Sequence, residues 1–209
     1  MDIESESKLL NKLKDSGEDS EKIMLELVLL YEKAGEPMKA VPHIENLLKN
    51  TEDNDKAVRW YFHLGQIMEQ IENYETAVSY YFKALDLKTS DKKILYFIYN
   101  NLGYCLNALG RYEEADKYCC EAVYINPYCQ NAYKNLGIAL EGLGEFMEAA
   151  KTYMLGAAIN PSDPRARQHL NALLSRHSEI KVDYPAFEKI IEDFRSHIIE
   201  EPKSLGKER

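Results

Sequence analysis

Four cysteines crowd into a short stretch of the chain, and cysteine thiolates are preferred ligands of zinc. They are Cys105, Cys119, Cys120 and Cys129, in the spacing C-x13-CC-x8-C. This spacing lacks the C-x2-C pairs typical of zinc ribbons, and the adjacent Cys119 and Cys120 would point to different faces of a helix. The pattern favours reduced thiols that pack as small hydrophobic side chains, so we predict no metal site, no cofactor and no disulfide.

Neither the histidines nor any known catalytic motif in the sequence indicates an enzyme. The five histidines are His43, His63, His169, His177 and His197. No two of them are spaced i and i+4, the spacing at which one helix presents two ligands to a metal. The chain also has no glycine-rich phosphate loop, no H-E-x-x-H and no G-x-S-x-G. We therefore predict that the protein is not an enzyme.

Composition narrows the class of partner. The 209 residues include 26 Lys and Arg against 35 Asp and Glu, a net charge of −9. Nucleic-acid affinity comes largely from Lys and Arg that displace phosphate counterions, so an acidic chain suits it poorly. No window approaches the roughly 20 apolar residues of a membrane helix, and the sequence MDIESESKLL is acidic where a secretory signal would be basic. We expect a cytoplasmic protein with no nucleic acid bound and no membrane insertion.

The elements that must position any binding residues are helices. Only 10 glycines and 7 prolines occur, which implies few turns. A gap-free repeat of 34 residues then organises the chain: Gly103, Leu109, Gly110, Ala115 and Pro127 recur as Gly137, Leu143, Gly144, Ala149 and Pro161. Within each copy the apolar residues fall at i, i+3, i+4 or i+7, which gives each helix one buried stripe.

Two further copies lie upstream. One reads Tyr61-x2-Leu64-Gly65-x2-Met68 and continues as Ala77-x3-Tyr81. The other is weaker, because it has Val28 where the glycine belongs. It also has Pro42 within its expected second helix, where proline removes a backbone donor and should kink the helix.

This pattern resembles the tetratricopeptide repeat, a helix-turn-helix unit of 34 residues with the signature W-x2-L-G-x2-Y…A-x3-F…P. The resemblance implies an all-α fold, a right-handed α-solenoid of helix-turn-helix hairpins with a C-terminal capping helix. We predict an acidic N-terminal lead at 1–20, which is a short helix or disordered. Four repeat units follow, at about 21–54, 58–91, 96–129 and 130–163. The chain then continues with a capping helix at 164–177 and a C-terminal amphipathic helix with a charged tail at 178–209.

The resemblance also implies where a partner binds, since the first helices of such repeats line a concave groove. The groove residues expected from it are Arg59, Phe62, Gln66, Phe97, Asn100, Asn101, Tyr104, Asn131, Lys134, Asn135, Ile138, Arg165 and His169. Among these we expect Tyr104, Phe62 and Phe97 to be apolar anchors. Lys134 and Arg165 are expected to meet an acidic side chain or carboxylate.

The implied function is a non-catalytic interaction module or adaptor, whose partner is a peptide segment or helix of another protein. Two alternatives stay open. One is a self-assembling scaffold, a homo-oligomer in which the helix at 178–209 docks in a neighbour's groove. The other is a chaperone of the same repeat type that holds an exported or unfolded client.

Two finer expectations concern the groove. The carboxylate clamp of related chaperone cofactors is matched by Asn135 and, by substitution, Arg165, whereas Asn100, Tyr104 and His169 depart from it. Eight of the 15 tyrosines occupy repeat positions and are expected in the core. Six of the other seven are the better candidates for a contact surface, namely Tyr80, Tyr96, Tyr104, Tyr118, Tyr124 and Tyr128.

Overall fold

The computed structural model describes residues 20–181, together with residues 8, 9, 11, 185, 189 and 192. Most of the predicted N-terminal lead and of the predicted C-terminal helix and tail therefore lies outside the described residues. Over the described part, the regular elements are all helical, and none of these helices is long and apolar enough to cross a membrane. The chain divides into two compact units, residues 1–91 and 92–209, which are described separately.

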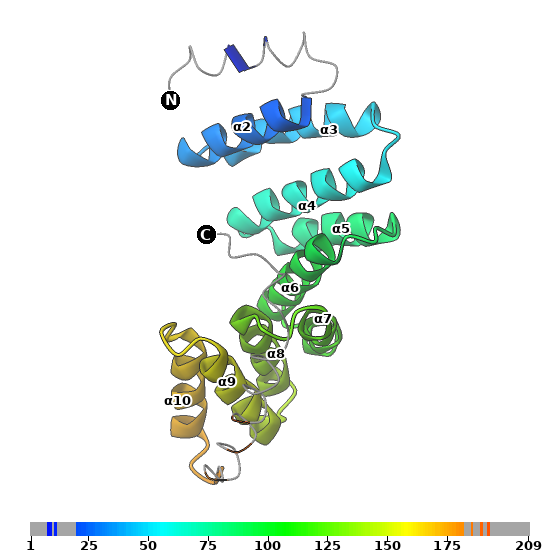
Figure 1. The fold of residues 1–209 in the computed structure, drawn as a ribbon. Coiled ribbons are helices and arrows are strands. Elements are labelled where there is room, and N and C mark those ends of the chain that lie inside the picture. Colours follow the sequence, from blue (N-terminus) through cyan, green and yellow to red (C-terminus); the bar gives the residue numbers. More distant parts are fainter. Residues whose placement is uncertain are drawn as a thin grey trace. The chain divides into compact units, whose positions relative to one another are not determined.

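The first unit contains two helical hairpins (Figure 1). Its elements are α2 (Ser20–Lys33), the 3-10 helix η1 (Pro37–Ala40), α3 (Val41–Lys49), α4 (Asn54–Gln70) and α5 (Tyr74–Asp86). The N-terminus of α4 is capped by Asp53, whose Oδ1 accepts hydrogen bonds from the backbone N–H groups of Asp55 and Lys56. In α5 the cap is Asn73, whose Oδ1 accepts from the N–H of Thr76.

Near Pro42, where a kink is predicted, the structure changes from a 3-10 helix to an α-helix. The second helix of the first hairpin is divided into η1 and α3, and Pro42 lies in the first turn of α3. A proline is tolerated there because a first-turn N–H has no partner within the helix. The α-helical part of this second helix, α3, has 9 residues, against 13 in α5.

The second unit stacks two further hairpins and a closing helix. Its helices are α6 (Lys92–Ala108), α7 (Tyr112–Ile125), α8 (Gln130–Gly142), α9 (Phe146–Ile159) and α10 (Arg165–Arg176). The first helices contact one another directly, α6 with α8 and α8 with α10, while the second helices α7 and α9 make no comparable contact. Elements on the inner side of a curved stack lie closer together, so α6, α8 and α10 line the inner face of this unit. The fold is thus the all-α stack of hairpins that the repeat predicts.

A glycine and a tyrosine set the distance between the two helices of a hairpin. A Cβ placed on Gly65 would lie 2.3 Å from the ring of Tyr81, and one on Gly137 would lie 2.4 Å from the ring of Tyr153. Both tyrosines are fully buried. Their hydroxyls donate hydrogen bonds to glutamates of the first helices, to Glu69 at 2.8 Å and to Glu141 at 3.0 Å.

The first helix of every hairpin ends in the same backbone turn. In each, the residue after the left-handed position donates its N–H to the carbonyl five residues earlier, the bond typical of a Schellman motif. The left-handed residues are Gly35, Glu72, Gly110 and Gly144, with φ of +71°, +60°, +71° and +80°. The sequence predicts this role for Gly110 and Gly144, and the structure confirms both. Glu72 is the exception, because a side chain in this conformation costs about 1–2 kcal/mol.

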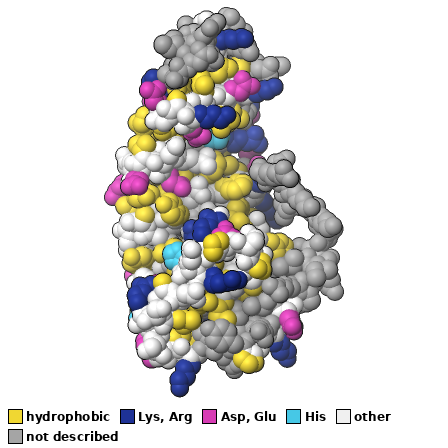
Figure 2. All heavy atoms as spheres, turned by 90° about the vertical axis from the view of Figure 1, so that its left-hand side faces the viewer, with side chains coloured by type: hydrophobic (Ala, Val, Ile, Leu, Met, Phe, Trp, Pro, Cys, Tyr) yellow, Lys and Arg dark blue, Asp and Glu magenta, His cyan; other side chains and the backbone are white. Residues whose placement is uncertain are grey.

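Large hydrophobic side chains on the surface of the described residues are few and scattered. They are Leu29, Met38, Ile71, Phe97, Tyr124 and Met147. On the face shown in Figure 2, hydrophobic side chains are interspersed with acidic and basic ones. Single exposed hydrophobic residues are normal in folded proteins, so exposure alone does not locate a binding site.

Replacing Glu72 by glycine should stabilise the protein. Glycine removes the cost of the left-handed conformation and loses only part of that gain to its greater backbone entropy. We expect Glu72→Gly to raise the free energy of unfolding by about 0.5–1 kcal/mol, measured by urea denaturation. The matched control is Gly110→Ala, which should lower it by about 1 kcal/mol. Equal stability of Glu72→Gly and the parent would contradict the prediction.

Candidate functional site

Ten of the predicted groove residues lie on α6, α8 and α10, the helices that line the inner face of the second unit. Nine of them are at least partly exposed, namely Phe97, Asn100, Asn101, Tyr104, Asn131, Lys134, Ile138, Arg165 and His169. Phe97 is 39% exposed and lies edge-on to the buried Tyr96, with ring centroids 5.2 Å apart. This set, from α6, α8 and α10, is called the inner face below.

Asn135 departs from the prediction. It is only 2% exposed, and its Nδ2 donates to the backbone oxygen of Asn100 at 3.2 Å and to the Oδ1 of Asn100 at 3.1 Å. In return the Nδ2 of Asn107 donates to the backbone oxygen of Asn135 at 2.8 Å. Asn107 and Asn135 therefore join α6 to α8, and we correct Asn135 from a groove contact to a packing residue.

Tyr104 and Lys134 form the central pair of the inner face. The Nζ of Lys134, on α8, lies 5.8 Å from the centroid of the Tyr104 ring, on α6. An ammonium group over an aromatic face is attracted by the ring quadrupole. The same ammonium helps to lower the pKa of His169 on α10. Lys134 thus brings a positive charge to the middle of this face.

Arg165 is ion-paired at the end of the inner face. Its Nε lies 3.0 Å from both carboxylate oxygens of Asp163, and its guanidinium lowers the pKa of Asp163 to about 2. Because the Arg165 side chain is 53% exposed, the pair is accessible to solvent. An acidic partner would therefore compete with Asp163 for this guanidinium.

A hollow of about 340 Å³ opens on the inner face between α8 and α10. It is lined by Tyr112, Ile138, Glu141, Gly142, His169 and Arg176. The carboxylate of Glu141 accepts the hydroxyl hydrogen bond of Tyr153 and pairs with Arg176, whose guanidinium nitrogen lies 2.6 Å away. The walls are therefore fixed by bonds within the protein, which leaves the hollow itself open for a side chain of a partner.

His169 contributes a neutral imidazole to this hollow. Its ring stacks on Tyr153 with centroids 5.3 Å apart. Burial, and then the charges of Lys134 and Arg176, lower the pKa of His169 below its usual value, while Glu141 acts in the opposite direction. The neutral ring can donate a hydrogen bond from one nitrogen and accept one at the other.

Sequence reasoning missed Glu141 and Arg176. A signal for Glu141 was present, because Glu69 precedes Tyr81 by 12 residues and Glu141 precedes Tyr153 by the same interval. Arg176 follows the last repeat and has no counterpart, so its ion pair could be found only in the structure.

In the first unit the predicted groove residues differ in accessibility, and Arg59 is exposed. Phe62, expected to be an exposed anchor, is only 7% exposed and contacts the ring of Tyr81, with centroids 6.1 Å apart. Gln66 is half-buried, and its Oε1 lies 3.2 Å from the Nδ1 of His63. Arg59 is ion-paired with Asp91 at 3.7 Å. Phe62 is thus corrected to a core residue.

The tyrosines outside the repeat positions differ in exposure, and so do the cysteines. Tyr124 is 85% exposed, whereas Tyr96, expected at a contact surface, is buried against Ala122 and Ala132. Cys105 and Cys119 are buried, as expected of small hydrophobic residues, and burial raises the pKa of the Cys119 thiol. Among the described residues, the structure contains no group of His, Cys, Asp and Glu that could hold a metal.

Comparison with known proteins identifies the repeat. Tetratricopeptide repeat models match residues 25–92 and 98–129. These segments of the chain are tetratricopeptide repeats. No curated protein sequence matches it.

Several solved structures share the fold. A MamA fragment from Desulfovibrio magneticus RS-1 is 20% identical with a TM-score of 0.65, over 86% of this chain and 97% of that one. BtubC from P. vanneervenii is 17% identical with a TM-score of 0.71, over 99% and 93%. The first repeat domain of RPAP3, bound to the HSP90 peptide SRMEEVD, is 20% identical with a TM-score of 0.53, over 59% and 94%.

The tetratricopeptide repeat clamp for a C-terminal carboxylate is not reproduced on this inner face. Asn135, which matches the clamp in sequence, is buried between α6 and α8. Arg165, the other match, is held by Asp163. The inner face instead combines Tyr104, Lys134 and the hollow beside His169, a different set of contacts for a partner.

The burial of His169 predicts a pH dependence of stability. The pKa of His169 is lower in the folded chain than in the unfolded one, where it is about 6.5. The unfolded chain therefore binds the proton first as pH falls, so the contribution is complete above about pH 6.5 and is lost below it. We expect His169→Gln to show a smaller drop in melting temperature between pH 7.5 and 5 than the parent does. His63→Gln, at the equivalent position of α4, is the control; a parental pH profile in His169→Gln would contradict the assignment.

Proposed function

We propose that this tetratricopeptide repeat protein is a non-catalytic adaptor that binds a peptide segment or helix of another protein on the inner face of its second unit. The observation that carries the proposal is the hollow beside Ile138 and His169, because five of its six lining residues belong to the first helices α8 and α10. Recognition of protein segments is the function typical of this repeat, and a hollow of this size accepts one or two side chains.

The inner face offers a partner three kinds of contact. The ring of Tyr104 and the side chain of Ile138 provide apolar surface, and aromatic residues are frequent hot spots of interfaces. The ammonium group of Lys134 can meet a carboxylate, and the amides of Asn100 and Asn131 can bond to a peptide backbone. Together they suit an extended segment or amphipathic helix with an apolar side chain beside an acidic one.

Preorganisation favours binding at this face. The Asn107–Asn135 clasp fixes α8 against α6, and the Glu141–Arg176 pair fixes α10 against α8. A rigid face loses little conformational entropy when the partner docks, so most of the ordering cost falls on the peptide.

The test removes the central pair of the inner face. A partner is first recovered by affinity capture with the full chain and identified by mass spectrometry. We expect Tyr104→Ala with Lys134→Ala to weaken its binding at least about thirtyfold, the loss typical of an interface hot spot worth 2 kcal/mol. Isothermal titration calorimetry measures the affinity, and circular dichroism checks that the helical signal and melting curve remain those of the parent.

The matched control is the pair Tyr118→Ala with Lys117→Ala. Lys117 lies over the ring of Tyr118 at 5.4 Å, but on the second helix α7. This variant should bind like the parent. Equal affinity of the Tyr104/Lys134 variant and the parent would refute binding at the inner face. A change in molecular mass of the Tyr104/Lys134 variant, measured by light scattering, would assign the face to self-assembly instead.

A further inference from the structure

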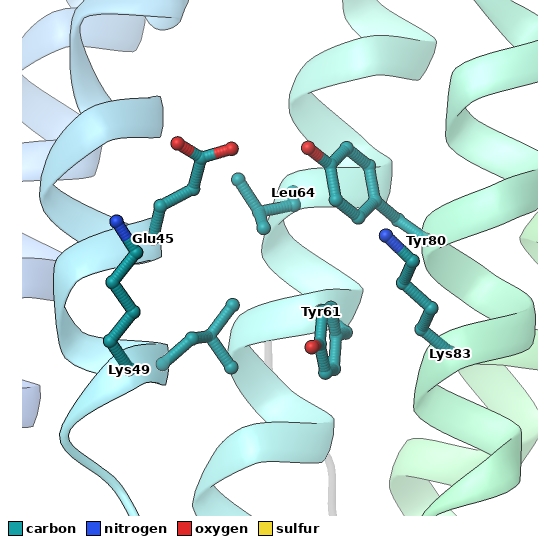
Figure 3. Close-up of a pocket in the computed structure, with 7 residues that line it drawn as sticks. Glu45, Lys49, Tyr61, Leu64, Tyr80 and Lys83 are labelled. Carbon is teal, nitrogen blue, oxygen red and sulfur yellow. The ribbon is translucent and has the colours of Figure 1, made fainter.

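A second hollow, also of about 340 Å³, lies in the first unit. Its walls are Glu45, Leu48 and Lys49 of α3 on one side and Tyr80 and Lys83 of α5 on the other, with Tyr61 and Leu64 of α4 between them (Figure 3). Both α3 and α5 pack on α4 but make no comparable contact with each other, so the hollow is a furrow. We call it the outer furrow.

The outer furrow is distinct from the groove that the repeat predicts. An α-helix turns by about 100° per residue. Tyr61 and Leu64 therefore lie on the side of α4 opposite to the groove positions Arg59, Phe62 and Gln66. A ligand in the outer furrow would contact the second helices of the hairpins, whereas a groove ligand contacts the first helices.

Two lysines of the outer furrow are left without a carboxylate. The Nζ of Lys83 lies 5.1 Å from the ring centroid of Tyr80 and 5.9 Å from that of Tyr61, which holds the ammonium beside two aromatic faces. Neither Lys83 nor Lys49 forms an ion pair with any residue that the structure describes. Burial, and then the nearby carboxylate of Glu45, raise the pKa of Tyr80.

Comparison with the next hairpin shows which residues of the outer furrow serve the packing of the repeat and which do not. There Tyr99 and Tyr118 stack with centroids 6.0 Å apart, as Tyr61 and Tyr80 stack at 6.4 Å. Glu121, however, occupies the position that corresponds to Lys83. The stacked tyrosines thus belong to the packing of the repeat, whereas the positive charge is peculiar to the outer furrow and is not required by packing.

We propose that the outer furrow is a second docking site, which takes an acidic segment of a protein partner with an Asp or Glu carboxylate against Lys49 and Lys83. Charge complementarity favours this occupant, because the furrow has two ammonium groups, neither of them ion-paired within the described part of the chain, against the one carboxylate of Glu45, in a chain of net charge −9. The exposed edges of Leu48 and Tyr61 suit the aliphatic part of such a segment. The net charge disfavours a polyanion such as nucleic acid. With the inner face of the second unit for one partner and the outer furrow of the first unit for another, the chain would join two partners.

The experiment selects peptides on the full chain. A phage-displayed library of random 12-residue peptides is panned in parallel against the parent and against Lys49→Glu with Lys83→Glu, and both pools are sequenced. We expect the peptides captured by the parent and lost by the variant to be enriched in Asp and Glu. A synthetic peptide from this set should bind the variant at least about tenfold more weakly than the parent, because each lost attraction is replaced by a repulsion.

Three controls make the result specific. Lys56→Glu reverses an exposed charge of α4 outside the furrow and should leave the binding of that peptide unchanged. The Tyr104/Lys134 variant should also bind it like the parent, which separates this site from the inner face. Lys49→Ala with Lys83→Ala should reproduce a weaker loss with the melting curve of the parent, so that unfolding is not the cause.

Several results would overturn the proposal. Identical peptide pools from the parent and the charge-reversed variant would show that the lysines bind no segment. A furrow-dependent pool without an excess of Asp and Glu would exclude the acidic partner. A change in self-association of Lys49→Glu with Lys83→Glu, measured by sedimentation, would assign the furrow to a second copy of the chain.

Discussion

The structure depends on the close approach of two helices at a glycine. Where a side chain on Gly65 or Gly137 would begin, the ring of Tyr81 or Tyr153 already lies within 2.4 Å. The ring fills the space between the helices, and its hydroxyl reaches a glutamate one helix away. Packing at this contact sets the separation of the helices, so it also sets where the first helices lie and which of their residues form an inner face. A bulkier residue at the glycine would force apart the helices on which that face rests.

The third hairpin departs from this contact in a way that links packing to the site. Cys119 takes the place of the tyrosine, and its Sγ lies 2.3 Å from where a Cβ on Gly103 would be. Without a tyrosine hydroxyl no acceptor is needed, and the glutamate position is Asn107. The Asn107 amide is therefore available to the next hairpin, where it binds the backbone of Asn135. A substitution inside one hairpin thus gives the clasp that fixes α8 against α6.

The sequence predicted the features that recur. The 34-residue interval located the hairpins, and the left-handed glycines followed from their place after each first helix. The accessibility of individual groove residues did not follow, because equivalent positions differ in their neighbours. Phe62 and Lys134 share a repeat position, yet Phe62 packs against Tyr81 whereas the ammonium of Lys134 lies over Tyr104. The hollow beside His169 could not be predicted from the sequence either. Arg176 lies past the last repeat, and its pairing with Glu141 depends on how the turn between α9 and α10 places α10.

These differences indicate that stability and recognition depend on different positions of the repeat. The alanines and most of the glycines and buried tyrosines recur from hairpin to hairpin, because each hairpin must meet its neighbour in a similar way; Val28, Glu72 and Cys119 are the exceptions. Positions that face away from the contact carry no such requirement, and there the chain places Lys134 on one hairpin and Lys83 on another. A change at Lys134 or Lys83 alters the charge offered to a partner and leaves the helix contacts intact. A change at Gly137 alters the helix contact first and the charges only through it. Binding specificity can therefore vary in this chain without loss of the fold, as long as the variation is confined to residues that the repeat does not determine.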